Sequence, residues 1–302
     1  MSDSLPGYPG RGHWRRVPKT GQHYVDVGAG DPVLFLHGNP SWSYLWRHLL
    51  TALAPEHRCV AADWPGMGLS ARSPMPAAPA DRLARHLTQL DALFEHLVAA
   101  GLPDRGWTFA LHDWGGPLGL AWARRHPGVL GRLVALNTVG FRLPPDYRLP
   151  PFLRWIRDSR TVAGLVHTTN LFARTAVLAG VTRRLPAPVR RAYLRPYRRR
   201  RNRSAVLEFV RAIPGGDPND PVWRLLDPAD PGADAALAGL PTFVGWGMRD
   251  PVFTPALLTE WERRYPHARV HRYPDAGHFV TEDAAGDLGR DLVAFLRETE
   301  AR

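Results

Sequence analysis

The stretch that decides the fold is FALHDWGGPLGLAW, residues 109–122. Its first three residues are apolar and typical of a buried β-strand, which ends abruptly in His112 and Asp113. Two glycines follow, and apolar residues then recur at helical spacing. This order predicts a tight strand–turn–helix with Asp113 at the tip of the strand, because small residues behind it let helix and strand approach closely.

Strand and helix patterns alternate on both sides of this stretch. Apolar runs typical of strands occupy residues 22–28, 32–38, 58–64, 107–113 and 130–138. Helical spacing occurs at residues 43–54, 80–101 and 117–127. The second of these helices ends at Gly101, the residue type that commonly caps a helix C-terminus. Strands that are apolar on both faces and alternate with helices indicate a parallel sheet covered on both sides.

The pattern changes between residues 141 and 234, where strand patterns disappear. Helical segments such as 149–181 and 202–213 replace them, with prolines between. Strand and helix patterns then resume at residues 240–250, 254–266, 268–278 and 288–302. We therefore expect one α/β core, residues 1–140 and 235–302, with a helical cap, residues 141–234, inserted before the last two strands.

The composition is that of an ordinary globular protein: 44% of the 302 residues are hydrophobic and 22% are charged. Cys59 is the only cysteine, which excludes an internal disulfide and a cysteine-based metal site. The N-terminal residues lack the apolar run of a signal peptide. No apolar segment reaches the length needed to cross a bilayer. We therefore expect a cytoplasmic protein without a membrane span.

Polar residues follow five of the expected strands, where ligands bind in an open parallel sheet. They are His37 with Asn39, Asp113 with Trp114, Asn137, Asp250 and His278. Asp113, Asp250 and His278 come in the chain order nucleophile, acid, histidine. An aspartate nucleophile forms an ester, which water activated by the histidine hydrolyses, while the second acid orients the imidazole.

Each of these residues also has a structural alternative. Asp113 can cap the following helix, Asp250 can begin a turn before Pro251, and Asn39 can shape a turn before Pro40. Trp114 can be core packing, His278 can be a hydrogen-bonded turn residue, and Asn137 either orients a water or only ends a strand. The agreement of several motifs far apart in the chain favours a catalytic site. For His37 and His112 the structural role is favoured.

These residues resemble the α/β-hydrolase superfamily and, within it, the haloalkane dehalogenases. The resemblance runs from about Tyr24 to Arg297. It is carried by the motifs HGNPSWSYLWR (37–47), DWPGMGLS (63–70), HDWGGPLGLAWARRHP (112–127), GMRDPVF (247–253) and DAGHFVTED (275–283). It implies the α/β-hydrolase fold, with a mostly parallel eight-stranded sheet, helices on both faces and an inserted helical cap. Leu111 departs from the family, which commonly has glycine there.

The resemblance also implies roles for individual residues. In the dehalogenases the tryptophan after the aspartate holds the leaving halide through its indole N–H, which corresponds to Trp114. The asparagine of the His-Gly-Asn-Pro loop, here Asn39, is the second donor. One subgroup has a glutamate as triad acid where this chain has Asn137, so the acid is expected at Asp250, as in the third subgroup. The leading prediction is a haloalkane dehalogenase that converts a carbon–halogen bond to an alcohol through an ester on Asp113.

Two other activities remain open. The β-lactone decarboxylases of bacterial olefin biosynthesis are similar at the same five positions and in the cap segment YLRPYRRRRNRSAVLEFVRAIP (193–214). They imply an aspartate that opens a four-membered lactone, from which carbon dioxide and an alkene leave. Epoxide hydrolases need two cap tyrosines, for which Tyr147, Tyr193 and Tyr197 are the candidates. A complete triad argues against an inactive binding module.

We expect a small hydrophobic substrate, no cofactor and no metal. The histidines lack the paired spacing of metal ligands, and the glycine-rich segments lack the lysine of a phosphate-binding loop. The net charge of +11 is interpreted as a solvated surface, with an acidic partner or a membrane surface as the alternative. The arginine-rich segment Arg183–Arg203 lacks the regular aromatics of a nucleic-acid platform, so we expect a solvated helix there or a docking face for a pathway enzyme.

Overall fold

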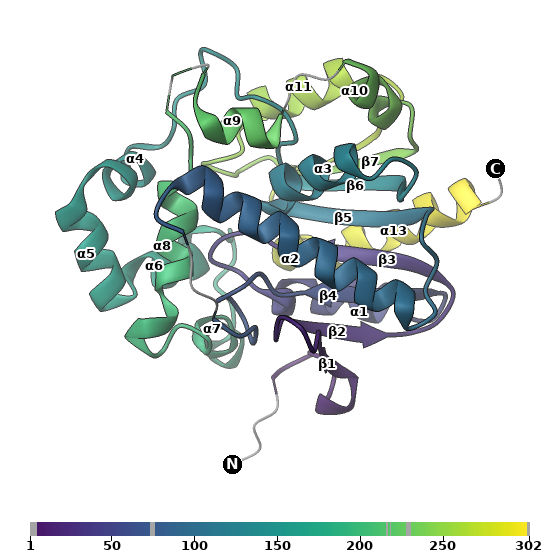
Figure 1. Ribbon diagram of the computed structural model, residues 1–302, viewed down its shortest axis with the longest axis horizontal. Coiled ribbons are helices and arrows are strands. Elements are labelled where there is room, and N and C mark those ends of the chain that lie inside the picture. Colours follow the sequence, from purple (N-terminus) through teal and green to yellow (C-terminus); the bar gives the residue numbers. More distant parts are fainter. Residues whose placement is uncertain (1–4, 73–75, 216, 218, 228–230, 301–302) are drawn as a thin grey trace.

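The protein is described by a computed structural model that covers residues 5–72, 76–215, 217, 219–227 and 231–300. Within these residues an eight-stranded sheet runs through the middle of the molecule (Figure 1), in the order β1-β2-β4-β3-β5-β6-β7-β8. The strands are β1 Trp14–Arg16, β2 His23–Val27, β3 Asp31–Leu36, β4 His57–Ala62, β5 Trp107–Asp113, β6 Leu130–Thr138, β7 Thr242–Gly247 and β8 Arg269–Tyr273. Only the β1–β2 and β2–β4 pairs are antiparallel. The predicted mostly parallel sheet is confirmed.

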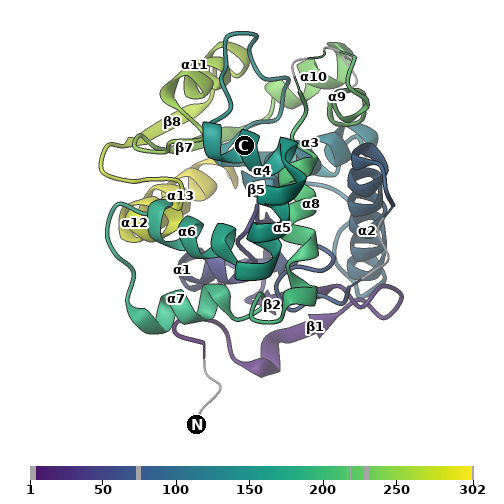
Figure 2. The same ribbon diagram turned by 90° about the vertical axis from the view of Figure 1, so that its left-hand side faces the viewer.

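The two faces of the sheet bury two separate hydrophobic clusters. Leu34 and Leu36 of β3 pack toward α2 (Pro79–Ala99) and α3 (Gly115–Arg125), whereas Val33 and Phe35 pack toward α1 (Arg47–Leu53) and α13 (Ala285–Glu300). Successive strand residues point to opposite faces, so a strand between two helical layers must be apolar throughout. Figure 2 shows α1 and α13 on one side of the sheet and α2 on the other.

The long helix α2 ends as its sequence predicts. Gly101 adopts φ +94, a left-handed conformation that favours glycine. Its N–H donates to the carbonyl of Val98, and the N–H of Leu102 donates to the carbonyl of Leu97. This pair of bonds is a Schellman motif, which satisfies the last free carbonyls of the helix.

Within the described residues, seven α-helices lie between β6 and β7. They are α4 Pro151–Asp158, α5 Arg160–Thr169, α6 Leu171–Ala179, α7 Ala187–Leu194, α8 Ser204–Arg211, α9 Pro221–Leu226 and α10 Pro231–Ala238. We call α4 to α8 the cap helices, and Figure 2 shows α4 to α7 together in front of the sheet. The division into a core and a cap of residues 141–234 remains a prediction, and α10 spans its second boundary.

The segment 149–181, predicted to be helical, is three helices rather than one. Ser159 separates α4 from α5 and caps α5 by accepting a hydrogen bond from the N–H of Val162 at 3.3 Å. Asn170 separates α5 from α6 by adopting a left-handed conformation, with φ 60. None of the helices in the described part of the chain has both the length and the apolar character that a membrane span needs.

Candidate functional site

Asp113 occupies a sharp turn between β5 and α3. Its φ of 50 is left-handed, which is uncommon for any residue other than glycine. The hydroxyl of Thr138, at the end of β6, donates to the Asp113 carbonyl at 2.6 Å and helps to hold this conformation. A Cβ at Gly115 would lie 1.9 Å from the carbonyl oxygen of Leu36, and one at Gly116 would lie 1.9 Å from Thr138 Oγ1. The turn therefore requires both glycines.

Leu111, the departure from the family pattern, is accommodated from the helix side. A Cβ at Gly119 would lie 2.7 Å from Leu111 Cδ2, so the glycine in α3 leaves the space that the leucine side chain fills. Leu111 is fully buried. Helix and strand thus approach closely even though the small residue stands on α3 instead of β5.

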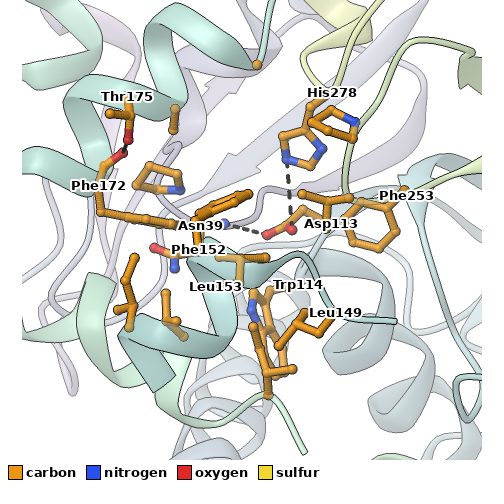
Figure 3. Close-up of a pocket in the computed structure, with 18 of the residues that line it drawn as sticks. Asn39, Asp113, Trp114, Leu149, Phe152, Leu153, Phe172, Thr175, Phe253 and His278 are labelled. Atoms are coloured by element: carbon orange, nitrogen blue, oxygen red, sulfur yellow. Dashed lines mark hydrogen bonds and ion pairs between the residues drawn. The ribbon is translucent and has the colours of Figure 1, made fainter. Parts of the chain in front are cut away.

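His278 lies between two carboxylates, as Figure 3 shows for its Asp113 side. Its Nδ1–H donates to Oδ2 of Asp250 at 2.8 Å, and its Nε2 lies 3.9 Å from Oδ2 of Asp113. The ring of Phe253 stacks against the imidazole, with 5.6 Å between ring centroids and 8° between planes. The structure therefore brings together the nucleophile, base and acid that the sequence predicts, although β5, β7 and β8 lie far apart in the chain.

Asp250 is held by four donors and its side chain is fully buried. Oδ1 accepts the backbone N–H groups of Val252 and Phe253 at 2.7 and 3.0 Å. Oδ2 accepts the side-chain N–H of Asn137 at 3.0 Å in addition to the bond from His278. A buried carboxylate with all these partners is fixed in position and compensated for its lost hydration.

The surroundings shift the pKa values of both His278 and Asp113. Burial lowers the pKa of His278, but the charges of Asp250 and Asp113 outweigh it, so the pKa is raised above 6.5. Burial raises the pKa of Asp113, and the opposing effects of His278 and of the backbone N–H groups of Asn39 and Trp114 do not fully cancel it. The imidazole therefore takes up a proton readily, as a general base must.

Two potential anion donors stand beside Asp113. The backbone N–H of Asn39 donates to Asp113 Oδ1 at 2.6 Å, and its side-chain amide donates to the carbonyl of Val206 at 3.0 Å. An amide carries a second N–H, which is left for a ligand. The indole N–H of Trp114 meets no acceptor among the described residues, and both side chains line the same cavity.

The cavity above Asp113 has a volume of about 430 Å³. Its polar lining consists of Asn39, Asp113, Trp114, Tyr147, Thr175 and His278. The apolar walls come from the cap helices, including Leu153, Ile156, Val162, Val166 and Phe172, and from residues outside them such as Val139, Leu149 and Phe253. A concave apolar site with a few convergent polar groups is typical of an enzyme that binds a hydrophobic small molecule.

The tyrosines considered for epoxide opening are engaged elsewhere. Tyr147 lines the cavity, but its hydroxyl donates to the carbonyl of Val252 at 3.0 Å. The hydroxyl of Tyr197 donates to the Ser41 carbonyl at 3.0 Å, and that of Tyr193 donates to Glu282. Only one of the three faces the cavity, so the pair that an epoxide hydrolase needs is not assembled from these tyrosines.

The flanking histidines have structural partners. His112 donates from Nε2 to the carbonyl of His278 at 2.9 Å, so it positions the loop that carries His278. His37 donates from Nδ1 to the Gly38 carbonyl and accepts the N–H of Trp64 at Nε2. Burial is the main reason that the pKa of each is lowered, which keeps both neutral.

Sequence reasoning left the role of Asn137 open and missed that of Phe253. Asn137 has φ 39, the second left-handed residue at the strand ends, and its amide bonds Gly247 and Asp250. Its place at the end of β6 was the available signal. Phe253 stands three residues after Asp250 in the GMRDPVF motif, but its stacking on His278 depends on a turn that no sequence pattern specifies.

Three comparisons with known proteins agree with this geometry. A family model described as alpha/beta hydrolase fold matches residues 31–285. A cis-3-alkyl-4-alkyloxetan-2-one decarboxylase of Xanthomonas campestris is 39% identical over 92% of this chain and 93% of its own length. A haloalkane dehalogenase 2 of Mycobacterium bovis is 32% identical over 95% of each chain. The crystal structure of the haloalkane dehalogenase DbeA of Bradyrhizobium elkani has a TM-score of 0.82 and 26% identity, covering 96% of this chain and 98% of that one.

Proposed function

Because the chain belongs to the α/β-hydrolase family, alongside haloalkane dehalogenases and oxetanone decarboxylases, we propose that Asp113 is a nucleophile that attacks a saturated carbon bearing an anionic leaving group. One observation carries the proposal. The Asp113 carboxylate faces an apolar cavity, with His278 Nε2 at 3.9 Å and two hydrogen-bond donors, from Asn39 and Trp114, beside it. The core supplies this machinery, and the cap helices supply much of the apolar wall.

We propose a cis-3,4-dialkyl oxetan-2-one, a β-lactone, as the substrate. The apolar walls suit two alkyl chains, and the likeness to the Xanthomonas decarboxylase extends over nearly the whole of both chains. Asp113 Oδ2 attacks ring carbon C4 and breaks the C4–O bond, which gives an alkyl ester and a free carboxylate. The C2–C3 electron pair then forms the alkene as carbon dioxide leaves and the C4–Oδ2 bond breaks. The Asp113 carboxylate is regenerated without water.

The displaced carboxylate lies where Asn39 and Trp114 offer N–H groups. Both donors are fixed by the fold before the substrate arrives, Trp114 by the turn after Asp113 and Asn39 by its bond to Val206. Donors held in place stabilise developing negative charge without reorganisation. The roles of Asp113, Asn39 and Trp114 belong to this proposal, and those of His278 and Asp250 belong to the hydrolytic route that is the second candidate.

Haloalkane dehalogenation is the second candidate, and the unpaired indole N–H of Trp114 favours it. A halide displaced by Asp113 would be held between this N–H and the Asn39 amide. His278 would then take a proton from water, whose oxygen attacks the ester carbonyl, while Asp250 stabilises the imidazolium. The products are an alcohol, a halide ion and a proton.

The test offers both substrates to the same preparation. A cis-dialkyl β-lactone should give the cis-alkene by gas chromatography and carbon dioxide in the headspace, and Asp113→Ala should abolish both. Parallel incubation with 1-bromoalkanes measures halide release. Halide release without alkene would replace the decarboxylase by the dehalogenase, and a folded protein that does neither would overturn the proposed nucleophile.

The variant His278→Ala separates the two routes further. Hydrolysis of an alkyl ester needs the base, so a bromoalkane should leave a stable adduct on Asp113, detectable by intact-protein mass spectrometry. The lactone adduct should collapse to alkene and carbon dioxide, because that route consumes no water. A lactone adduct that persists in this variant would contradict the water-free step.

A further inference from the structure

The large apolar side chains that are exposed in the described chain lie on three successive cap helices. They are Phe152 (44% exposed), Trp155 (62%), Leu165 (54%), Leu171 (45%) and Leu178 (55%). We call these five residues of α4, α5 and α6 the apolar cap face, and Figure 2 shows the three helices grouped on the side turned toward the viewer. Scattered exposed leucines are normal, but a group confined to one region marks an interaction surface.

The candidate active site opens within this face. Phe152, Trp155 and Leu171 are each at least 44% exposed and also line the cavity above Asp113. The cavity therefore reaches the surface between α4 and α6, with an apolar rim. A substrate leaving water for the cavity would first meet these side chains.

Positive charge surrounds the same face. Residues 159–207, which include α5, α6 and α7, contain twelve arginines and no aspartate or glutamate. The side chain of Arg200 donates to His167 Nδ1 at 3.4 Å, and that of Arg203 donates to the His167 carbonyl at 3.1 Å. Burial is the largest cause of the lowered pKa of His167, and the charges of Arg200 and Arg203 lower it further. Basic side chains thus gather at the end of α5, two residues from Leu165.

Several of these arginines carry uncompensated charge. Arg174, Arg198, Arg199 and Arg201 are exposed, and none forms an ion pair with a carboxylate in the described part of the chain. Some exposed arginines of the core, in contrast, are paired with carboxylates. Arg263 and Arg290, for example, pair with Glu260 and Asp287 on their own helices. Exposed arginines without a carboxylate partner thus gather in residues 159–207, a segment that contains no acidic residue of its own.

We propose that the apolar cap face binds the surface of an anionic phospholipid bilayer, with the cavity mouth turned toward the lipid. Tryptophan, phenylalanine and leucine beside arginine are the composition of helices that lie in a membrane interface. Arginines at the edge would bind lipid phosphates. A nucleic acid would use the arginines but would leave the leucines and Trp155 exposed. Delivery of an alkyl substrate from the bilayer rests on the proposed function, whereas the binding itself does not.

Sedimentation with vesicles tests the binding. The protein should sediment with vesicles of equimolar phosphatidylglycerol and phosphatidylcholine, more weakly as salt is added, and far less with phosphatidylcholine alone. The triple variant Arg198→Gln, Arg199→Gln, Arg201→Gln should bind at least about tenfold more weakly, since each basic side chain near such a surface contributes about a fivefold factor. The control Arg105→Gln, Arg263→Gln, Arg290→Gln removes the same charge from the core and should bind as the unmodified protein does.

The fluorescence of Trp155 tests whether the apolar cap face contacts the lipid. Trp155 is the one exposed tryptophan among the described residues, so lipids brominated along the acyl chain should quench part of the protein fluorescence. Trp155→Phe should remove that quenching and leave sedimentation nearly unchanged. Equal quenching in this variant would place the contact elsewhere and overturn the proposal.

The leucines separate binding from catalysis. Leu165 and Leu178 do not line the cavity, so Leu165→Gln with Leu178→Gln should weaken vesicle binding and leave turnover of detergent-dispersed lactone unchanged. Turnover in detergent without vesicle binding would overturn the membrane proposal alone. Vesicle binding without turnover would overturn only the proposed function. Failure to bind vesicles together with capture of a specific protein by this face would replace the bilayer by a protein partner.

Discussion

Asn137 donates its side-chain N–H to Oδ2 of Asp250, the same oxygen that accepts the bond from His278. The amide also bonds both the N–H and the carbonyl of Gly247, so it joins the end of β6 to the end of β7. Asn137 therefore holds the carboxylate of Asp250 in place at the end of the neighbouring strand.

With a haloalkane as substrate, Asn137→Ala should therefore slow hydrolysis of the ester, the step that needs His278. Loss of a hydrogen bond to a charged group costs about 1.5–3 kcal/mol, or roughly 10- to 100-fold in kcat, with little change in KM. Asp250 would hold its charge with one donor fewer and attract the imidazolium proton more strongly. The acid limb of the pH–rate profile should move to higher pH, whereas a merely structural defect would lower the rate without moving it.

The raised pKa of His278 predicts the pH dependence of halide release. Its neutral form activates water, and Asp250 and Asp113 hold its pKa above 6.5 despite burial. The rate should rise with pH and reach half of its plateau above pH 6.5, measured as kcat across a pH series. Asp250→Asn should move this midpoint downward as well as lower the plateau. A midpoint below pH 6.5 in the unmodified protein would contradict the assignment.

Gly38 tests the position of the nucleophile. A Cβ at this residue would lie 2.1 Å from Asp113 Oδ1 and 2.2 Å from its Cβ, so Gly38→Ala must displace the carboxylate. We expect a loss of about 100-fold or more in kcat/KM, because small displacements of a reacting group cost this much. Gly164→Ala is the matched control, since nothing lies within 4 Å of its Cβ and the residue is in α5. That variant should retain activity and gain about 0.5–1 kcal/mol in stability by urea unfolding.

The buried pair Arg47 and Glu282 predicts acid sensitivity of the fold. Burial raises the pKa of Glu282, but hydrogen bonds from Arg47 and its neighbours hold it at about 2. Because this pKa is lower in the folded state than the usual 4.5, ionised Glu282 stabilises the fold at pH values above 4.5. The stabilisation is lost as the pH falls toward 2. It amounts to roughly 3 kcal/mol. Glu282→Gln should lose about this much at neutral pH and flatten the acid dependence of urea unfolding.

Glu298→Gln provides the comparison for that measurement. Glu298 pairs with Arg269 at the surface, where both side chains are exposed. Exposed ion pairs contribute at most about 1 kcal/mol, so this variant should unfold nearly as the unmodified protein does. If both variants lost the same free energy of unfolding, the buried Glu282 pair would contribute no more to stability than the exposed pair.

Much of the core could be predicted from the sequence because its signals are local. Continuous apolar runs mark β3 and β5, whose residues are buried on both faces, and Gly101 marks the end of α2. The edge strand β1 has no such signal, since its three residues are partly or fully exposed. It forms only because the register with β2 supplies hydrogen-bond partners.

The candidate site, too, could be predicted only where its sequence signals are local. Motifs locate Asp113, His278 and Asp250, because each follows a strand whose end is recognisable. The partners that orient them come from long-range packing, such as the contact of Phe253 with His278 and the bond from Asn137 to Asp250. The breaks at Ser159 and Asn170 were missed for a related reason. The apolar periodicity continues across both residues, while the chain turns to enclose the cavity.

The bond from the Asn39 amide to the Val206 carbonyl ties α8 to the reacting centre, whereas α4, α5 and α6 supply walls without bonding the triad. A change of side chain on α4, α5 or α6 therefore alters the shape of the cavity without touching this bond, whereas a shift of α8 moves the Asn39 amide beside Asp113.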